Sequence, residues 1–314
     1  MKRLFTADLL PARGTLIMCS SHEARCEGVV ERSDGWRPNS VLLFHYDDEN
    51  PKREKRHNRI STAFKLRRVP VIEQQFTEAD AVKSLRDNMG VLREFLREFA
   101  DQPIVFDISV FTKRHLLMML RWLDDEGCWD RVTFVYSEPE EYDVSRYVPL
   151  SFGLASFHQI PGFSACPDFS RALHLVMFLG YEGDRAFAAY EHVQPVITTL
   201  LIPFPSFKPS WEGKTEEFNK DVISLVGEEY IRRVDPVDPS LTHEALRTIL
   251  GDGSNTGEHA RVVCPLGTKP QTLGVYSYVR SCVDPPAIVY ASPLRHNHDF
   301  FSHGIGNSWF LKLT

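Results

Sequence analysis

The sequence lacks the features of a membrane-spanning, secreted or zinc-binding protein. No apolar run approaches the roughly 18 residues that a membrane helix needs, and the amino-terminal residues lack the apolar core of a secretory signal. The six cysteines are scattered without a CxxC pair, which favours reduced, mostly buried thiols over a disulfide framework or a zinc site. We therefore expect a cytoplasmic protein with no membrane association and no bound metal.

Two familiar phosphate-binding signatures are also missing. Neither the Walker A pattern GxxxxGK[ST] nor the dinucleotide-binding pattern GxGxxG occurs in the chain. The formal net charge is -6, which makes nucleic acid an unlikely partner but permits a local basic patch. With 314 residues, of which 43% are hydrophobic, the chain can form two domains of ordinary size with full cores.

The chain contains a strand and helix pattern that runs twice. In each half, short β-rich apolar segments alternate with helical segments four times and a fifth strand follows. This order predicts an α/β fold of two tandem, pseudo-duplicated Rossmann-like units with mostly parallel sheets, at residues 1–145 and 146–314. The predicted strands cover residues 15–19, 41–45, 69–73, 104–108 and 132–136, then 173–179, 196–202, 230–234, 260–264 and 287–290.

The remaining segments are assigned from periodicity and composition. Residues 154–172 are rich in aromatic and small residues and predict an irregular insertion, and residues 308–313 predict an extra edge strand. The predicted helices cover residues 23–31, 51–64, 78–99 and 112–126, then 184–192, 215–226, 242–250 and 270–281.

Basic residues recur in the loops after the first and fourth strands of each half. Arg25 lines up with Arg185, and Lys113 lines up with Lys269. Ligands of α/β proteins bind at the carboxyl ends of parallel strands, and helix starts favour anions. The pattern therefore indicates a phosphate-bearing ligand, held between or along the two halves.

The first half supplies polar residues at these strand ends. Ser21 can cap the helix that follows, while His22 and Glu23 can serve in acid–base chemistry. Asp107 ends the fourth strand and is a further acid–base candidate. An ordinary polar helix cap explains the serine, histidine and glutamate equally well.

The second half offers a shorter glycine-containing loop after its first strand. In this loop Gly180 permits a close approach of the backbone, Arg185 can bind a phosphate, and Glu182 can bind a ribose hydroxyl or act as a base. The alternative is a solvated helix start, at which acidic residues are favoured by the helix dipole.

The loop after the fourth strand of the second half reads Gly267-Thr268-Lys269-Pro270-Gln271. Glycine permits close approach, threonine can cap the helix, lysine supplies positive charge, and proline suits the first turn. With the free amides of the helix start, these residues predict an anion seat. An ordinary capped helix is the alternative.

The segment GTKPQTLGVYSY, residues 267–278, resembles the GTKP-type signature of CARF domains. These are Rossmann-like sensors of cyclic oligonucleotides in prokaryotic antiviral defence, and the related SAVED domains look like two such units fused. The first half departs from the signature, because it has no glycine between Asp107 and Arg114. No separate effector domain is evident either. The resemblance implies ligand contacts from Gly180, Glu182, Arg185, Gly267, Thr268, Lys269 and Gln271.

We therefore expect a sensor or accessory protein that binds a nucleotide or a nucleotide-derived second messenger, without a cofactor. A protein partner would then carry the effector activity. One alternative is a nucleotide-processing hydrolase or transferase, and another is a structural subunit that packs against partner proteins. The expected ligand-binding residues also include Ser21, Arg25 and Lys113, and the catalytic candidates are His22, Glu23, Asp107 and Glu182.

Overall fold

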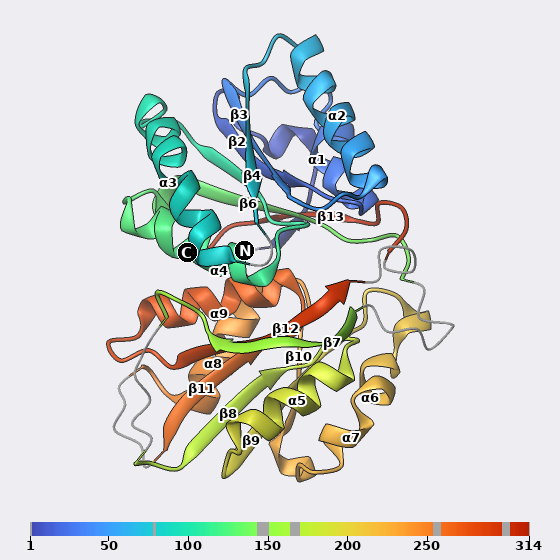
Figure 1. Ribbon diagram of the computed structural model, residues 1–314, viewed down its shortest axis with the longest axis vertical. Coiled ribbons are helices and arrows are strands. Elements are labelled where there is room, and N and C mark those ends of the chain that lie inside the picture. The colour runs from blue at the N-terminus through green and yellow to red at the C-terminus, as the bar shows by residue number, and fades with distance from the viewer. Residues whose placement is uncertain are drawn as a thin grey trace. The chain divides into compact units, whose positions relative to one another are not determined.

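The computed structural model describes residues 2–77, 80–142, 151–163, 170–253, 259–296 and 302–313. The chain divides into two compact units, Met1–Asp143 with Phe301–Thr314, and Val144–Phe300 (Figure 1). Both units have α/β architecture, which confirms the predicted fold class. The carboxyl-terminal segment belongs to the first unit, whereas the sequence analysis assigned it to the second.

The first unit is built on a seven-stranded sheet with the order β1-β13-β6-β5-β2-β3-β4. Strands β2 to β6 are parallel, and β13 joins the sheet in the antiparallel direction between β6 and β1. The strands are β1 (Lys2–Leu4), β2 (Thr15–Ser20), β3 (Ser40–Tyr46), β4 (Val71–Phe76), β5 (Ile104–Asp107), β6 (Val132–Ser137) and β13 (Ser308–Leu311). The helices are α1 (Gly28–Arg32), α2 (Pro51–Leu66), α3 (Ala81–Glu98) and α4 (Lys113–Asp125).

The second unit is built on a six-stranded sheet with the order β10-β9-β8-β11-β12-β7. Strand β7 is antiparallel to β12, and the other strands are parallel. The strands are β7 (Ser151–Gln159), β8 (Leu173–Phe178), β9 (Ile197–Pro203), β10 (Ile231–Val234), β11 (Ala260–Pro265) and β12 (Ala287–His296). The helices are α5 (Gly183–Val193), α6 (Lys214–Phe218), α7 (Lys220–Ile223), α8 (Pro239–Leu250) and α9 (Lys269–Ser281).

The two sheets repeat one topology. In each unit the parallel strands lie in the order third, second, first, fourth, fifth, and one antiparallel strand pairs with the fifth. The central strands β2 and β11 are buried along their whole length, as expected for parallel strands that are covered on both faces. The core of each unit therefore lies along its first and fourth strands, and the loops that leave these strands are firmly positioned.

Two sequence predictions about the antiparallel strands were wrong. Strand β13 was predicted at an edge, but it lies between β1 and β6. The segment predicted as an irregular insertion begins within β7, which runs along β12. Gly153 has a positive φ, and the β12 register shifts opposite this part of β7, between Ser292 and Pro293. This bulge interrupts the alternation from which a strand would be recognised.

A further difference is the helix predicted over residues 215–226, which is divided into α6 and α7 at Asn219. The side-chain Nδ2 of Asn219 donates to the carbonyls of Thr215 and Gly180, both at 2.7 Å. A side-chain amide that binds backbone carbonyls competes with the helical hydrogen bonds and ends the helix. The same bonds tie this turn to the loop after β8.

In the described part of the chain, no helix has both the length and the apolar character required to cross a membrane.

Candidate functional site

The two candidate loops of the second unit lie side by side at one edge of its sheet. Strands β8 and β11 are neighbours, with Phe178 opposite Pro265, so their loops leave the sheet together. A Cβ atom at Gly180 would lie 2.7 Å from the backbone oxygen of Leu266, so only glycine fits this contact between the loops. The strand order reverses between β8 and β11, which is where α/β sheets form ligand crevices.

The start of α9 is a complete capping box. The Thr268 hydroxyl accepts from the Gln271 amide at 3.2 Å, and the Gln271 side chain accepts from the Thr268 amide at 3.0 Å. The Thr268 hydroxyl also donates to the carbonyl of Pro236 at 2.5 Å. The backbone amides of Thr268 and Gln271, which were expected to be free to bind an anion, therefore already donate hydrogen bonds within the capping box. Pro270 has no amide hydrogen, so the predicted seat depends chiefly on the half-buried Lys269.

Arg185, which was predicted to bind a phosphate, is buried in a polar cluster of the second unit. One guanidinium nitrogen pairs with Glu182, and Nε donates to the carbonyl of Ala291 at 2.7 Å. The guanidinium lies over the ring of Tyr290, 5.0 Å from its centroid, and the Ser151 hydroxyl donates to Glu182. Burial alone would lower the pKa of Arg185, but the Glu182 carboxylate and the Tyr290 hydroxyl, with a smaller contribution from Cys264, together raise it.

The first unit contains an equivalent cluster around Arg25. Its guanidinium donates to both oxygens of Glu23 at 2.8 and 2.9 Å, and to the Tyr136 hydroxyl at 3.4 Å. The Ser302 hydroxyl donates to Glu23 at 2.7 Å. Burial alone would lower the pKa of Arg25, but the Glu23 carboxylate, together with Tyr142 and Tyr136, raises it. Each unit therefore contains an arginine, a glutamate, a fifth-strand tyrosine and a serine from the segment of its antiparallel strand.

The two arginines differ in one nitrogen. Arg25 uses Nε, Nη1 and Nη2 in bonds within its unit. In contrast, Nη2 of Arg185 is buried and has no partner of hydrogen-bond geometry among the described residues. The guanidinium also interacts with the Tyr290 hydroxyl, which contributes to its raised pKa. An unsatisfied buried donor is costly, so an acceptor from outside the described residues would be favourable at this nitrogen.

The other first-unit candidates are held close to the sheet. Asp107 accepts from the Ser109 amide at 2.9 Å and from its hydroxyl, and Ser21 contacts the His22 ring at 3.4 Å. Lys113 begins α4 and is half-buried, as Lys269 is at α9.

Cys26 follows Arg25 in the chain. Burial raises the pKa of its thiol to about 12, so this thiol is not a reactive thiolate.

One polar network of the first unit was not anticipated. The Ser20 hydroxyl lies 3.0 Å from Nδ1 of His57, whose Nε2 lies 3.2 Å from Glu73. The Ser61 hydroxyl also binds Glu73, which lowers the pKa of that carboxyl to about 2. Ser20 has no exposed surface, so the network joins α2 to β2 and β4 and does not present a nucleophile. No local sequence motif predicts this network, because its residues come from three separate elements, β2, α2 and β4.

No group of three or more metal-binding side chains is present among the described residues. Residues 295–304 contain three histidines, which suggest a metal site, but residues 297–301 with the middle histidine lie outside the described part of the chain.

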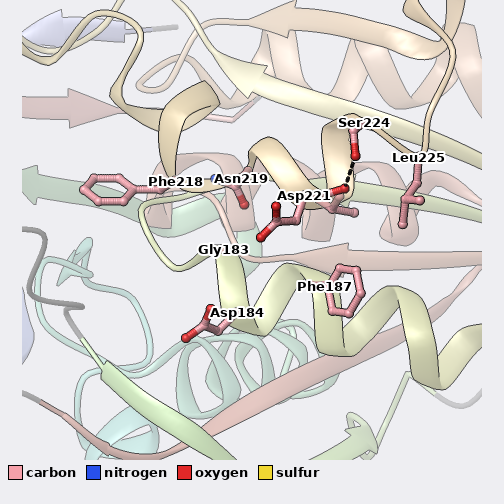
Figure 2. A pocket seen from close by; sticks show the side chains of 9 residues that line it. Gly183, Asp184, Phe187, Phe218, Asn219, Asp221, Ser224 and Leu225 are labelled. Carbon is pink, nitrogen blue, oxygen red and sulfur yellow. Dashed lines mark hydrogen bonds between the residues drawn. The ribbon is translucent and has the colours of Figure 1, made fainter.

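A pocket of about 480 Å³ lies beside the loop that follows β8, between α5 and the turn at Asn219 (Figure 2). Gly183 forms part of its wall, and a Cβ atom there would collide with the backbone oxygen of Phe218. The glycine therefore lets the turn at Asn219 pack against the start of α5. The sequence does not predict this pocket, because the turn lies inside a predicted helix.

Comparisons with known proteins give a likeness of fold. No family model matches the chain, and no curated protein matches it. Among solved structures, the chain is similar to a type III CRISPR defence DNA nuclease activated by cyclic oligoadenylate, with a TM-score of 0.52 and 12% identity over 93% of this chain and 67% of that chain. At this identity the likeness concerns the fold alone.

Two other solved structures match less well. The cytoplasmic domain of a prokaryotic cation chloride cotransporter has a TM-score of 0.28 and 9% identity, over 91% of this chain and 99% of that chain. O-ureido-L-serine synthase has a TM-score of 0.21 and 13% identity, over 84% of this chain and 76% of that chain. Neither score is high enough to bear on function.

Proposed function

We propose that this chain is a nucleotide-sensing protein of prokaryotic antiviral defence, and that it binds a cyclic oligonucleotide at the loops after β8 and β11. The GTKP-type segment supports this proposal, as does the fold likeness to a nuclease whose activator is cyclic oligoadenylate. Cyclic oligoadenylates are therefore the first ligands to test.

The observation that carries the proposal is Nη2 of Arg185, a buried donor without a geometric partner in the helix that follows the β8 loop, with its guanidinium against β12. A phosphate oxygen would satisfy this donor, and a charge-assisted bond to phosphate is stronger than a neutral one. Lys269 supplies a second positive charge at the start of α9. The two cations come from the two loops that the resemblance assigns to ligand contact.

Within the proposal, the other residues of the second unit have supporting roles. Gly180 and Gly267 let the backbone of the two loops approach the ligand. Thr268 and Gln271 fix the start of α9 through the capping box, and Glu182 orients Arg185. Ser21, Arg25 and Lys113 occupy the equivalent places of the first unit. We propose a smaller contribution from them, because every guanidinium nitrogen of Arg25 is already bonded.

We infer that the ligand is sensed and not consumed. A general base must be able to reach the proton that it removes. Glu23 and Glu182 are paired with arginines and also accept from serines, and Asp107 accepts from Ser109. These contacts favour structural roles for the three carboxylates over acid–base catalysis.

A thermal-shift screen with cyclic tri-, tetra- and hexaadenylate, followed by product analysis, tests the proposal. A ligand present at about 100 times its dissociation constant should add roughly 2.7 kcal/mol of stability. Lys269→Ala should weaken binding about tenfold, whereas Lys83→Ala, at an exposed position of α3, should leave it unchanged. Equal binding by Lys269→Ala and the wild type would contradict the site, and conversion of the ligand would favour an enzyme.

A further inference from the structure

The pocket beside α5 differs in chemistry from the proposed nucleotide site. Its polar wall is formed by Asp184 at the start of α5, Asn219 at the turn, and Asp221 in α7. Figure 2 shows the Asn219 oxygen and the Asp221 carboxylate on the side of the turn that faces α5. No lysine, arginine or histidine lines the pocket.

Asn219 is the most informative residue of the pocket. Its side chain is only 1% exposed, and its two Nδ2 bonds to backbone carbonyls fix the orientation of the amide. The Oδ1 atom is consequently an acceptor on the pocket side, and it has no hydrogen-bond partner among the described residues. A buried acceptor without a donor is costly, so a donor from outside the described chain would be stabilised at this position.

The carboxylates of Asp184 and Asp221 favour a donor that carries positive charge. Neither Asp184 nor Asp221 has an ion pair with another described residue, although both are exposed. Acidic residues are favoured in the first turn of a helix, and this accounts for their presence in α5 and α7. It does not account for the unsatisfied oxygen of Asn219 between them. Three acceptors around one space select a cation with N–H groups and repel a phosphate.

Apolar side chains complete the pocket. Phe187 is 39% exposed and Leu225 is 51% exposed, and both belong to its wall. Exposed apolar surface beside a charged site suits the methylene stem of a long basic side chain, which buries its carbons and keeps its charge at the polar end.

We propose that this pocket binds a guanidinium or ammonium group carried on an alkyl stem. The charged group donates to Asn219 Oδ1 and lies near Asp184 and Asp221, while the stem lies against Phe187 and Leu225. Arginine or lysine of a protein segment and a free alkylamine share this chemistry, and the experiment below distinguishes them. The site does not depend on the proposed nucleotide function, because its charge excludes the phosphates on which that function rests.

The test uses the full-length ¹⁵N-labelled protein and follows the side-chain amide signal of Asn219 by NMR. The small-molecule probe is N-butylguanidinium. The peptide probe is acetyl-Leu-Arg-Leu-amide, and its neutral control contains citrulline in place of arginine. We expect the charged probes to shift the Asn219 signal in a saturable manner. The neutral peptide should bind about tenfold more weakly or not at all.

Variants establish that the carboxylates are responsible. The double variant Asp184→Asn/Asp221→Asn should weaken binding of the charged probes about tenfold. The matched control Glu191→Gln/Glu228→Gln removes the same charge from two exposed positions of this unit and should bind like the wild type. The thermal transition of each variant shows whether it remains folded.

The relative affinities of the two charged probes identify the source of the cation. If the peptide binds at least about tenfold more tightly than N-butylguanidinium, the natural occupant is a basic side chain of a protein. Similar affinities for the peptide and N-butylguanidinium indicate that the natural occupant is a small alkylguanidinium or alkylammonium compound. The proposal is overturned if neither charged probe shifts the Asn219 signal, if the citrulline peptide binds equally well, or if the two double variants behave alike.

Discussion

In both units an arginine that follows the first parallel strand is buried beside a glutamate and beneath a tyrosine of the fifth strand. In the first unit all three nitrogens of Arg25 are bonded, and the side chain of Glu23 is only 5% exposed. In the second unit Nη2 of Arg185 has no described partner, and Glu182 is 15% exposed.

We propose that this difference separates a cluster that only supports the fold, around Arg25, from one that also binds ligand, around Arg185. A fully bonded ion pair can only support the fold, whereas an incompletely bonded one at a ligand edge can also bind. The comparison thus favours the second unit as the ligand-binding one, and the following predictions test it.

The largest expected effect is on stability. Arg25→Ala leaves Glu23 buried without its partner and should lower the free energy of unfolding by about 3–5 kcal/mol. Each glutamate keeps a bond from a serine, but Arg185→Ala should cost less, about 2–3 kcal/mol, because the side chain of Glu182 is 15% exposed and that of Glu23 only 5%. Urea denaturation followed by circular dichroism measures both values.

Hydrogen exchange shows whether each loss lies in the expected unit, at β6 for Arg25→Ala and at β12 for Arg185→Ala. Arg121→Ala breaks an exposed ion pair on α4 and should change stability by less than about 0.5 kcal/mol. The comparison fails if the two cluster variants are equally stable or if Arg185→Ala is the less stable one.

The second-largest expected effect is a pH dependence of stability, which arises where β6 meets the antiparallel strand β13. At the end of β6, Glu138 accepts from the Trp309 indole of β13, and burial raises the pKa of its carboxyl to about 7. The folded state binds the proton more tightly than the unfolded state, in which the pKa is about 4.5. The wild type should therefore lose up to about 3 kcal/mol of stability relative to Glu138→Gln as the pH rises from about 4.5 to about 7.

Denaturation curves of both proteins across this pH range measure the change. Glu140→Gln, at an exposed neighbouring position, should follow the wild-type profile. Strands β7 and β12 contain no acidic residue, so hydrogen exchange in the second unit should not show this dependence. A constant difference between Glu138→Gln and the wild type at every pH would exclude Glu138 as its source.

The third effect compares the two lysines at the helix starts. Lys269→Ala should reduce affinity for the cyclic oligoadenylate found in the screen about tenfold, whereas Lys113→Ala should reduce it by less than about threefold. The reason is that only the second unit combines its lysine with an unpartnered arginine nitrogen. Isothermal titration of both variants measures the ratio, and equal losses would mean that the units share the ligand.

The smallest effect concerns the helix caps. Thr268→Ala removes one half of a capping box and a bond to Pro236, and should cost about 1–2 kcal/mol of stability. Thr112→Ala removes the simpler cap of α4 and should cost about 1 kcal/mol. Thermal unfolding measures both, and Thr→Ser at each position should restore most of the loss. A larger cost at Thr112 would reverse the comparison.

The sequence predicted the repeated parallel strands because each is a short apolar run, and it predicted that the loops after the first and fourth strands lie at the same edge of each sheet. The arginine–glutamate pairs lie close enough in sequence to be suspected, at Glu23 with Arg25 and at Glu182 with Arg185. Their tyrosines come from strands more than 100 residues away. Such non-local contacts leave no trace in local periodicity.

The turn at Asn219 shows a second limit. Residues 215–226 have the composition of one helix, and only the contact of Asn219 with Gly180 explains why the helix ends there. The pocket next to this turn, with its unsatisfied oxygen, could therefore not be predicted. The position of β13 was missed for a similar reason, because a strand pattern does not identify the strand with which it will pair.

Strand β13 has a consequence for synthesis of the chain. A ribosome releases β1 to β6 long before Ser308–Leu311, the segment that pairs with both β1 and β6. The second unit has all of its strands outside the ribosome by then, because β7 to β12 precede β13 in the chain. Although domains generally fold from the amino terminus as they are made, here the later unit can finish first. Until β13 is made, the side of β6 that faces away from β5 has no partner strand. Nascent chains are open to mispairing along this edge.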